Sequence, residues 1–114
     1  MPFVNGRVIV FGAGEGGEQI VRSMLRDPDS SFVPVAVLDD SPDKSKRAIL
    51  GVPVRGSRQN LEDVAAETGA TDFLIAIPSA SRHVISDLDL AGRAAGLHVR
   101  VLPSTSELLG LLDI

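Results

Sequence analysis

Six residues near the N-terminus have the spacing of a phosphate-binding turn. They form the pattern G-x-G-x-x-G and are Gly12, Ala13, Gly14, Glu15, Gly16 and Gly17. The pattern follows an apolar run at 7–11 and opens a stretch with helical spacing, which is the context that this motif requires. Gly12 would form the tight turn, Gly14 would let the backbone approach a pyrophosphate, and Gly17 would let the helix pack closely on the strand. The first-turn amides and the helix dipole would then attract the phosphates.

The glycine pattern also has a purely structural interpretation, in which it is a strand-to-helix turn without a ligand. Glu15 bears on the choice, since its negative charge would oppose a diphosphate if the side chain pointed inward. The two interpretations therefore remain open at this point.

An acidic pair, Asp39 and Asp40, follows the second apolar run, FVPVAVL. In dinucleotide-binding folds, an acid at the end of the second strand hydrogen-bonds the adenosine ribose. Asp39 lies somewhat further beyond Gly14 than the usual spacing of about 20 residues. An acid here favours NAD over NADP, because a 2′-phosphate would meet like charge. The alternative is that the two acids only end a strand.

A further polar loop follows the apolar run at 71–77, and it consists of Pro78, Ser79, Ala80 and Ser81. Ligands of doubly wound sheets bind at the carboxyl ends of strands, near the point where strand order reverses. Ser79 and Ser81 could donate to a phosphate or ribose there, or could simply cap the next helix. Lys44, Lys46 and Arg47 could reach a 2′- or 3′-phosphate, as in NADP or CoA, or form a solvated loop.

No group of residues with the pattern of a catalytic site accompanies these positions. The chain has no tyrosine, so the tyrosine acid of short-chain dehydrogenases is excluded, and it has no cysteine, which excludes disulfides and thiolate chemistry. The two histidines, His83 and His98, are more consistent with surface residues than with a catalytic base. We therefore expect a binding surface with no catalytic residues and no metal site.

Strand and helix patterns alternate along the chain and must position these residues. The expected strands are 7–11, 32–38, a short and weak 49–54, 71–77 and 97–102. The expected helices run from 18 to about 26, from 61 to 67, from the 78–81 loop to about 95, and from 104 to 112. This alternation predicts an α/β three-layer sandwich, with about five parallel strands in order 3-2-1-4-5 and helices on both faces.

Length and composition fit one small domain over residues 1–114. Apolar residues make up 44% of the 114 residues, and the net charge is −4. Nucleic acid is not expected as a partner, because no basic stripe is present. No apolar run approaches the roughly 18 residues of a membrane span. A homo-oligomer would help so small a domain, and the apolar end LLGLLDI points to a truncated chain or to a covering partner.

Four stretches of the chain carry a family resemblance, VIVFGAGEGGEQIVRSML, FVPVAVLDDSPDKSKRAILGVPVRGS, FLIAIPSASR and GLHVRVLPSTSELL. Together they resemble the Rossmann-like domain of bacterial capsular polysaccharide biosynthesis proteins, the membrane-anchored nucleotide-sugar 4,6-dehydratases. A similar domain occurs in polyprenyl-phosphate sugar-1-phosphate transferases. The resemblance covers nearly the whole chain.

The resemblance implies a domain classed with CoA- and NAD-binding Rossmann domains. It also implies membrane helices before the domain and a dehydratase domain after it, so that this chain would be a cytoplasmic part of an inner-membrane protein. The dehydratase activity would belong to the other domain. By resemblance, the ligand positions are the glycine motif, Asp39 and the 78–81 loop.

These observations favour a non-catalytic, NAD- or nucleotide-binding module that regulates, stabilises or oligomerises a larger dehydratase. Three alternatives remain. The domain could supply NAD to a site completed by a partner domain, it could bind or sense CoA, or it could be a structural interaction domain with no ligand.

Overall fold

A parallel sheet of four strands lies at the centre of the computed structural model, which describes residues 6–27, 29–44, 47–77 and 80–102. The strands are β1 (Gly6–Phe11), β2 (Phe32–Leu38), β5 (Asp72–Ile75) and β6 (His98–Val101). Their order across the sheet is β2-β1-β5-β6, and all neighbours are parallel. The apolar run of β1 explains its central place, since a strand buried on both faces needs apolar residues throughout.

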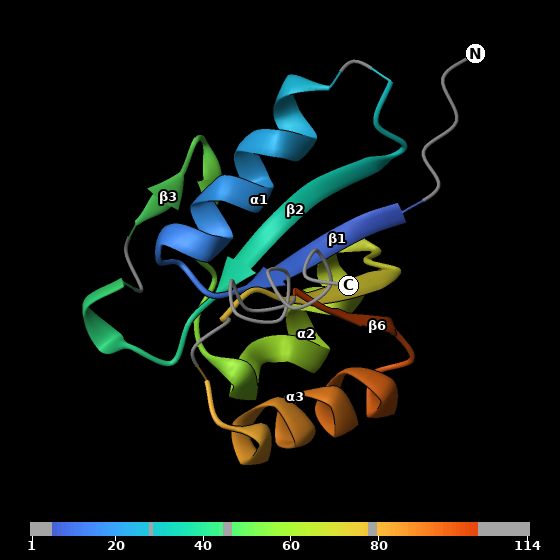
Figure 1. The fold of residues 1–114 in the computed structure, drawn as a ribbon. Coiled ribbons are helices and arrows are strands. Elements are labelled where there is room, and N and C mark those ends of the chain that lie inside the picture. The colour runs from blue at the N-terminus through green and yellow to red at the C-terminus, as the bar shows by residue number, and fades with distance from the viewer. Residues whose placement is uncertain (1–5, 28, 45–46, 78–79, 103–114) are drawn as a thin grey trace, which may run out of the picture.

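Helices cover both faces of the sheet (Figure 1). They are α1 (Glu15–Arg26), α2 (Leu61–Thr68) and α3 (Arg82–Ala94), with the short 3-10 helices η1 (Pro42–Lys44) and η2 (Arg58–Asn60). On one face α1 packs on β1 and β2, and on the other face α2 and α3 both pack against the cluster that contains Phe73. The predicted α/β class, with a parallel sheet between helices, is confirmed.

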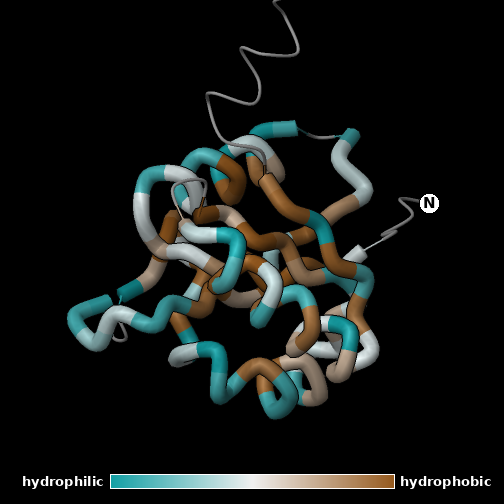
Figure 2. Tube along the Cα trace, turned by 60° about the horizontal axis from the view of Figure 1, so that its bottom comes forward, coloured by the Kyte–Doolittle hydropathy of each residue, from teal (hydrophilic) through white to brown (hydrophobic). Residues whose placement is uncertain are grey.

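The core consists of two apolar clusters, one on each side of the sheet. Side chains alternate along β1, so that Ile9 and Phe11 join α2 and α3 while Val8 and Val10 face α1. Phe73 from β5 is fully buried and meets Phe11 edge-on at 6.2 Å between ring centroids. Full burial of such a side chain contributes about 1.5–3 kcal/mol. Hydrophobic segments run through the middle of the molecule and hydrophilic ones lie around it (Figure 2).

The sequence pattern predicts most element positions well. Helix α1 begins at Glu15 rather than 18, because part of the glycine motif itself forms the first helical turn. Strand β2 contains Pro34, and the pairing with β1 shifts directly after it, from Val8 with Pro34 to Ile9 with Ala36. This bulge accommodates a proline inside a paired strand.

The predicted third strand, 49–54, is wrong as a continuous strand. The chain forms a small antiparallel hairpin there, with β3 (Ala48–Ile49) and β4 (Val52–Pro53). Leu50 and Gly51 turn the chain back, both with positive φ, at 53° and 88°. Beyond the hairpin, Val54 makes a single parallel bridge to Val37 of β2. In the predicted order 3-2-1-4-5 the third strand lies beside the second, and in the structure this place beside β2 is held by the bridge and not by a full strand.

The predicted helix 104–112, near the end of the chain, lies outside the described residues. Within the described ranges, no helix is both long enough and apolar enough to cross a membrane.

Candidate functional site

The glycine turn begins directly after β1, at Gly12. Its φ is +119°, a region that favours glycine, and its amide donates to the carbonyl of Leu38 at 2.8 Å. A Cβ on Gly12 would lie 2.6 Å from the carbonyl oxygen of Ala76. The turn is therefore held tightly between the ends of β2 and β5, and no larger residue fits at this position.

Gly17 joins the helix to the same turn. A Cβ at this position would lie 1.7 Å from the carbonyl oxygen of Gly12, which is closer than a carbon and an oxygen that are not bonded to each other can approach. The first turn of α1 therefore rests directly on the backbone of Gly12, which fixes the direction in which the helix start points.

Gly14 has a different environment, because its surroundings are open. The nearest atom to a Cβ built on it is Nζ of Lys44, at 3.8 Å, and its φ of −88° suits any residue. Gly14 is the N-cap of α1, and no side chain of the described residues caps this helix start. Glu15 is exposed and Gly16 is half-buried. Packing therefore does not require glycine at position 14.

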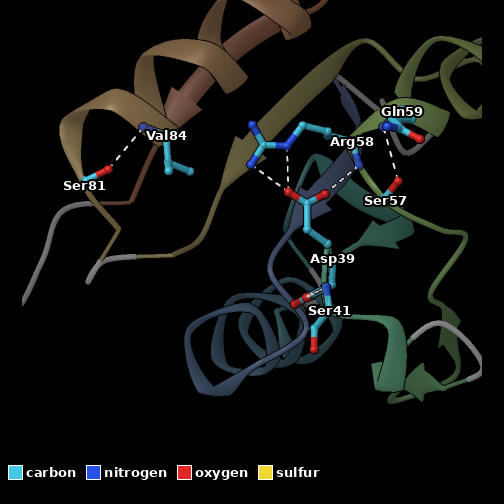
Figure 3. A network of polar contacts seen from close by, with 8 residues as sticks. Asp39, Ser41, Ser57, Arg58, Gln59, Ser81 and Val84 are labelled. Carbon is cyan, nitrogen blue, oxygen red and sulfur yellow. Dashed lines mark hydrogen bonds and ion pairs between the residues drawn. The ribbon is translucent and has the colours of Figure 1, made fainter.

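The carboxylate of Asp39 links the glycine turn to the loop after β2, and Figure 3 shows its contact with Ser41 in that loop. One oxygen accepts the amide of Ala13 at 2.7 Å, and the other accepts the amide of Ser41 at 2.8 Å. The amide of Asp39 donates to the carbonyl of Gly56 at 2.9 Å. The half-buried Asp39 thus lies against the glycine turn, where the sequence pattern predicts it.

A compact turn from Ser41 to Lys44 brings a positive charge to the same place. The Ser41 hydroxyl donates to the carboxylate of Asp43, and the amide of Lys44 donates to the carbonyl of Ser41 at 3.1 Å. The hydrogen bond from Ser41 is the main reason why the pKa of Asp43 lies below its ordinary value, helped by its own backbone and the charges of Arg47 and Lys44. This turn places the Lys44 ammonium in front of Gly14.

Asp40 does not contact the glycine turn but pairs with Arg58, at the start of η2. It accepts the backbone amide of Arg58 at 3.0 Å and its side-chain Nε at 2.6 Å. The guanidinium also lies 5.8 Å from the ring centre of Phe11, in cation–π range. No local signal in the sequence pairs Arg58 with Asp40, so the sequence alone does not predict a role for Arg58.

The 78–81 loop is only partly described, since Pro78 and Ser79 lie outside the described residues. Ile77, just before it, lies against the glycine turn, its Cγ2 3.0 Å from the built Cβ of Gly12. The amide of Ala80 donates to the carbonyl of Ile77 at 2.9 Å. The Ser81 hydroxyl accepts the amide of Val84 at 3.3 Å and so caps α3 (Figure 3). The capping role that the sequence allowed for Ser81 is thus present.

The carboxyl ends of β1, β2 and β5 therefore meet at one edge of the sheet. Beside them lie the first amides of α1, the carboxylate of Asp39 and the ammonium of Lys44. Such a set can bind an anionic, hydroxyl-bearing ligand such as a nucleotide. His83 and His98 are both exposed, and His98 lies at the opposite edge, where β6 begins. Among the described residues, no group of three or more potential metal-binding side chains gathers.

Curated relatives with similar sequences are polysaccharide biosynthesis proteins. One is the probable polysaccharide biosynthesis protein EpsC of Bacillus subtilis, 30% identical over 92% of this chain. Another is the capsular polysaccharide biosynthesis protein CapD of Staphylococcus aureus, 29% identical over 93% of this chain. The chain spans only 18% of the length of each of these relatives.

Solved structures show the same Rossmann-like fold. UDP-D-quinovosamine 4-dehydrogenase from Vibrio fischeri superposes with a TM-score of 0.75 at 24% identity, covering 93% of this chain and 84% of that one. The Rex-family repressor RSP in complex with β-NADH gives 0.66 at 18% identity, covering 93% of this chain and 57% of that one. The model of the CoA-binding domain matches residues 4–103. Because this match covers most of the sequence, the chain belongs to the CoA-binding domain family.

Proposed function

We propose that this chain is a nucleotide-binding module with NAD(H) as its ligand and with no catalytic residues of its own. The observation that carries the proposal is the open surface at Gly14. There an uncapped helix start, the Lys44 ammonium and the Asp39-bound amide of Ala13 lie together. Two glycines of the motif are required by packing, whereas Gly14 is not, so a ligand at this surface explains a glycine that the fold leaves free to vary.

The diphosphate of the ligand would lie against Gly14. The amides of the first turn of α1 and the helix dipole favour negative charge at this point. Lys44 adds a full positive charge close by, which offsets the exposed Glu15. A side chain at position 14 would occupy the space that the phosphates need.

The adenosine ribose would lie against Asp39. A carboxylate offers about four lone-pair sites, and the amides of Ala13 and Ser41 use two of them. The others can accept the 2′- and 3′-hydroxyls of a ribose. A 2′-phosphate would instead be repelled by the charge of Asp39, so we expect NAD(H) to bind better than NADP(H).

The module would serve a larger polysaccharide biosynthesis protein. Both curated relatives are named for this process, and each is much longer than the part that matches. We propose that the module lies in the cytoplasm as part of an inner-membrane nucleotide-sugar dehydratase. It would regulate, stabilise or oligomerise that protein through its nucleotide.

CoA is the second candidate ligand, and the family itself favours it, since the matching model describes a CoA-binding domain. CoA carries a 3′-phosphate on its ribose, which needs a nearby cation. Lys44 is next to the glycine turn, Arg47 is exposed, and Lys46 lies outside the described residues. Competition between CoA and NAD for the same site separates the two candidates.

The test is thermal unfolding of the chain with NAD, NADH, NADP, CoA and a UDP-sugar, each in excess. A ligand that binds only the folded state stabilises it by about 2.7 kcal/mol at a hundredfold excess over its Kd. We expect the largest rise in Tm with NAD or NADH. A larger rise with CoA would select the second candidate, and no rise with any of the five would contradict the nucleotide-binding function.

A further inference from the structure

Arg58 contacts the neighbours of both halves of the proposed nucleotide site. Its guanidinium lies 5.8 Å from the ring centre of Phe11, the residue directly before Gly12. It also pairs with the carboxylate of Asp40, the residue directly after Asp39. Through these two contacts Arg58 lies next to the glycine turn and next to the acid that would bind the ribose.

The backbone holds Arg58 in this place. Gly56, two residues earlier, accepts the amide of Asp39 at 2.9 Å. The amide of Arg58 itself donates to the carboxylate of Asp40 at 3.0 Å, and the side chain of Ser57 caps η2 (Figure 3). The end of β2 and the start of η2 are therefore joined on both sides of Arg58, which fixes where its side chain begins.

The guanidinium of Arg58 is held by its edge. Nε and Nη2 both lie 2.6 Å from one carboxylate oxygen of Asp40. The side chain is 33% exposed, so a ligand can reach it although Phe11 beneath it is buried. A planar guanidinium that is fixed by its edge is suited to stack on a flat ring.

The pairing with Asp40 also decides which part of a nucleotide fits here. The carboxylate opposes the positive charge of Arg58, so the pair has no net charge. A phosphate therefore gains little from this place. A nucleotide base is uncharged and gains stacking contact with the guanidinium, which does not require a free charge.

We propose that Arg58 stacks on the base of the bound nucleotide and makes the site prefer adenine to uracil. This inference rests on the proposed function, with the diphosphate at Gly14 and the ribose at Asp39. A base leaves its ribose on the side away from the 5′-phosphates, and Asp40 with Arg58 is the part of this loop that does not contact the glycine turn. Adenine has two rings and uracil one, so adenine covers more of the guanidinium.

Calorimetric titration of ADP and UDP tests the proposal, because the two ligands share the ribose and diphosphate and differ only in the base. Wild type is compared with Arg58→Lys, which keeps the positive charge opposite Asp40 but removes the planar group. Arg55→Lys is the matched control. Arg55 lies in the same loop, is 40% exposed and forms an ion pair with Glu67.

Wild type and the Arg55→Lys control should bind ADP several-fold more tightly than UDP. In Arg58→Lys we expect the affinity for ADP to fall by about tenfold and the affinity for UDP to fall much less. If Arg58 only held the loop, the variant would weaken both ligands equally. An unchanged ratio of the two affinities in Arg58→Lys would therefore overturn the proposal, and so would a wild type that binds UDP more tightly than ADP.

The same titrations separate this inference from the function on which it rests. A wild type that binds none of ADP, UDP and NAD would overturn the nucleotide site and the role of Arg58 together. A wild type that binds ADP, with the same ADP-to-UDP ratio in Arg58→Lys, would overturn the role of Arg58 alone.

A fluorescent adenine nucleotide, etheno-ADP, gives a second measurement. The chain has neither tryptophan nor tyrosine, so the base is read almost without background. Each protein is saturated with the ligand, and acrylamide is added as a neutral quencher. Quenching of the base should be several-fold weaker on wild type and on Arg55→Lys than in free solution, because Arg58 covers one face of the ring. In Arg58→Lys it should rise toward the free value, and equal quenching on all three proteins would overturn the proposal.

Discussion

The backbone amide of Ala13 donates to the carboxylate of Asp39 at 2.7 Å, so a hydrogen bond joins the glycine turn directly to the end of β2. The second oxygen of Asp39 holds the amide of Ser41 at 2.8 Å and thereby orders the turn that carries Lys44. One side chain thus fixes the two loops that would bind the phosphates. Asp39 has a structural role here even before any ribose reaches it.

Asp39→Ala should lower both stability and nucleotide affinity. The substitution leaves the amides of Ala13 and Ser41 without their acceptor, and a buried donor that loses its partner costs about 1–3 kcal/mol. We expect a loss of that size in the free energy of unfolding, measured with urea. Asp87→Ala, on the exposed surface of α3, is the matched control and should be near wild type. Equal stability of the two variants would show that the Asp39 bonds contribute nothing.

The two acids after β2 should differ in their effect on the ligand. Asp40 is held by Arg58 rather than by the glycine turn, and both side chains of this pair are about one-third exposed or more. Partly exposed ion pairs contribute at most about 1 kcal/mol. Asp40→Asn should therefore cost little stability and weaken NAD binding less than Asp39→Asn does, as measured by calorimetry. The reverse ranking would place the ribose at Asp40.

The same substitution should cost much more stability at Gly17 than at Gly14. Gly17→Ala forces a Cβ against the carbonyl of Gly12, and we expect it to lower the free energy of unfolding by about 2 kcal/mol or more. Gly14→Ala meets open space at an ordinary φ and should stay within about 1 kcal/mol of wild type. Urea unfolding of both variants gives the comparison, and a Gly17→Ala protein as stable as the wild type would refute the tight contact.

The titration of Asp43 should report the order of the Lys44 turn. The Ser41 hydroxyl is the main reason that its pKa is lowered, so Ser41→Ala should raise the pKa toward its ordinary value. Because the folded-state pKa is the lower one, ionised Asp43 favours folding above the unfolded-state pKa, and this contribution is lost as pH falls through the folded-state pKa. Nuclear magnetic resonance titration of the side-chain carboxyl measures the change. Ser86→Ala on α3 is the control, and an unchanged pKa in Ser41→Ala would contradict the assigned cause.

Local sequence signals sufficed for the elements that depend on local chemistry. The apolar runs located β1, β2, β5 and β6, and Gly12 with Gly17 identified the turn that joins β1 to α1.

Other features depend on contacts between distant residues or on rare backbone conformations. The β3–β4 hairpin requires Leu50 at a positive φ, which few leucines adopt, so its turn gave no sequence signal. The Asp40–Arg58 pair joins two loops that only the folded sheet brings together. The position of Lys44 in front of Gly14 follows from the bond between Asp39 and Ser41, so spacing alone could suggest the lysine but could not place it.

The proposed nucleotide site is tested most directly by calorimetric titration of NAD into the wild type and into Gly14→Val. The nearest atom to a Cβ at position 14 is 3.8 Å away, so the variant should fold while its side chain fills the phosphate position. Ala94→Val, at an exposed position on α3, is the matched control. We predict saturable NAD binding to the wild type and the control, and its loss in folded Gly14→Val. Binding that survives in Gly14→Val, or that is absent from all three proteins, would contradict a nucleotide site at the glycine turn.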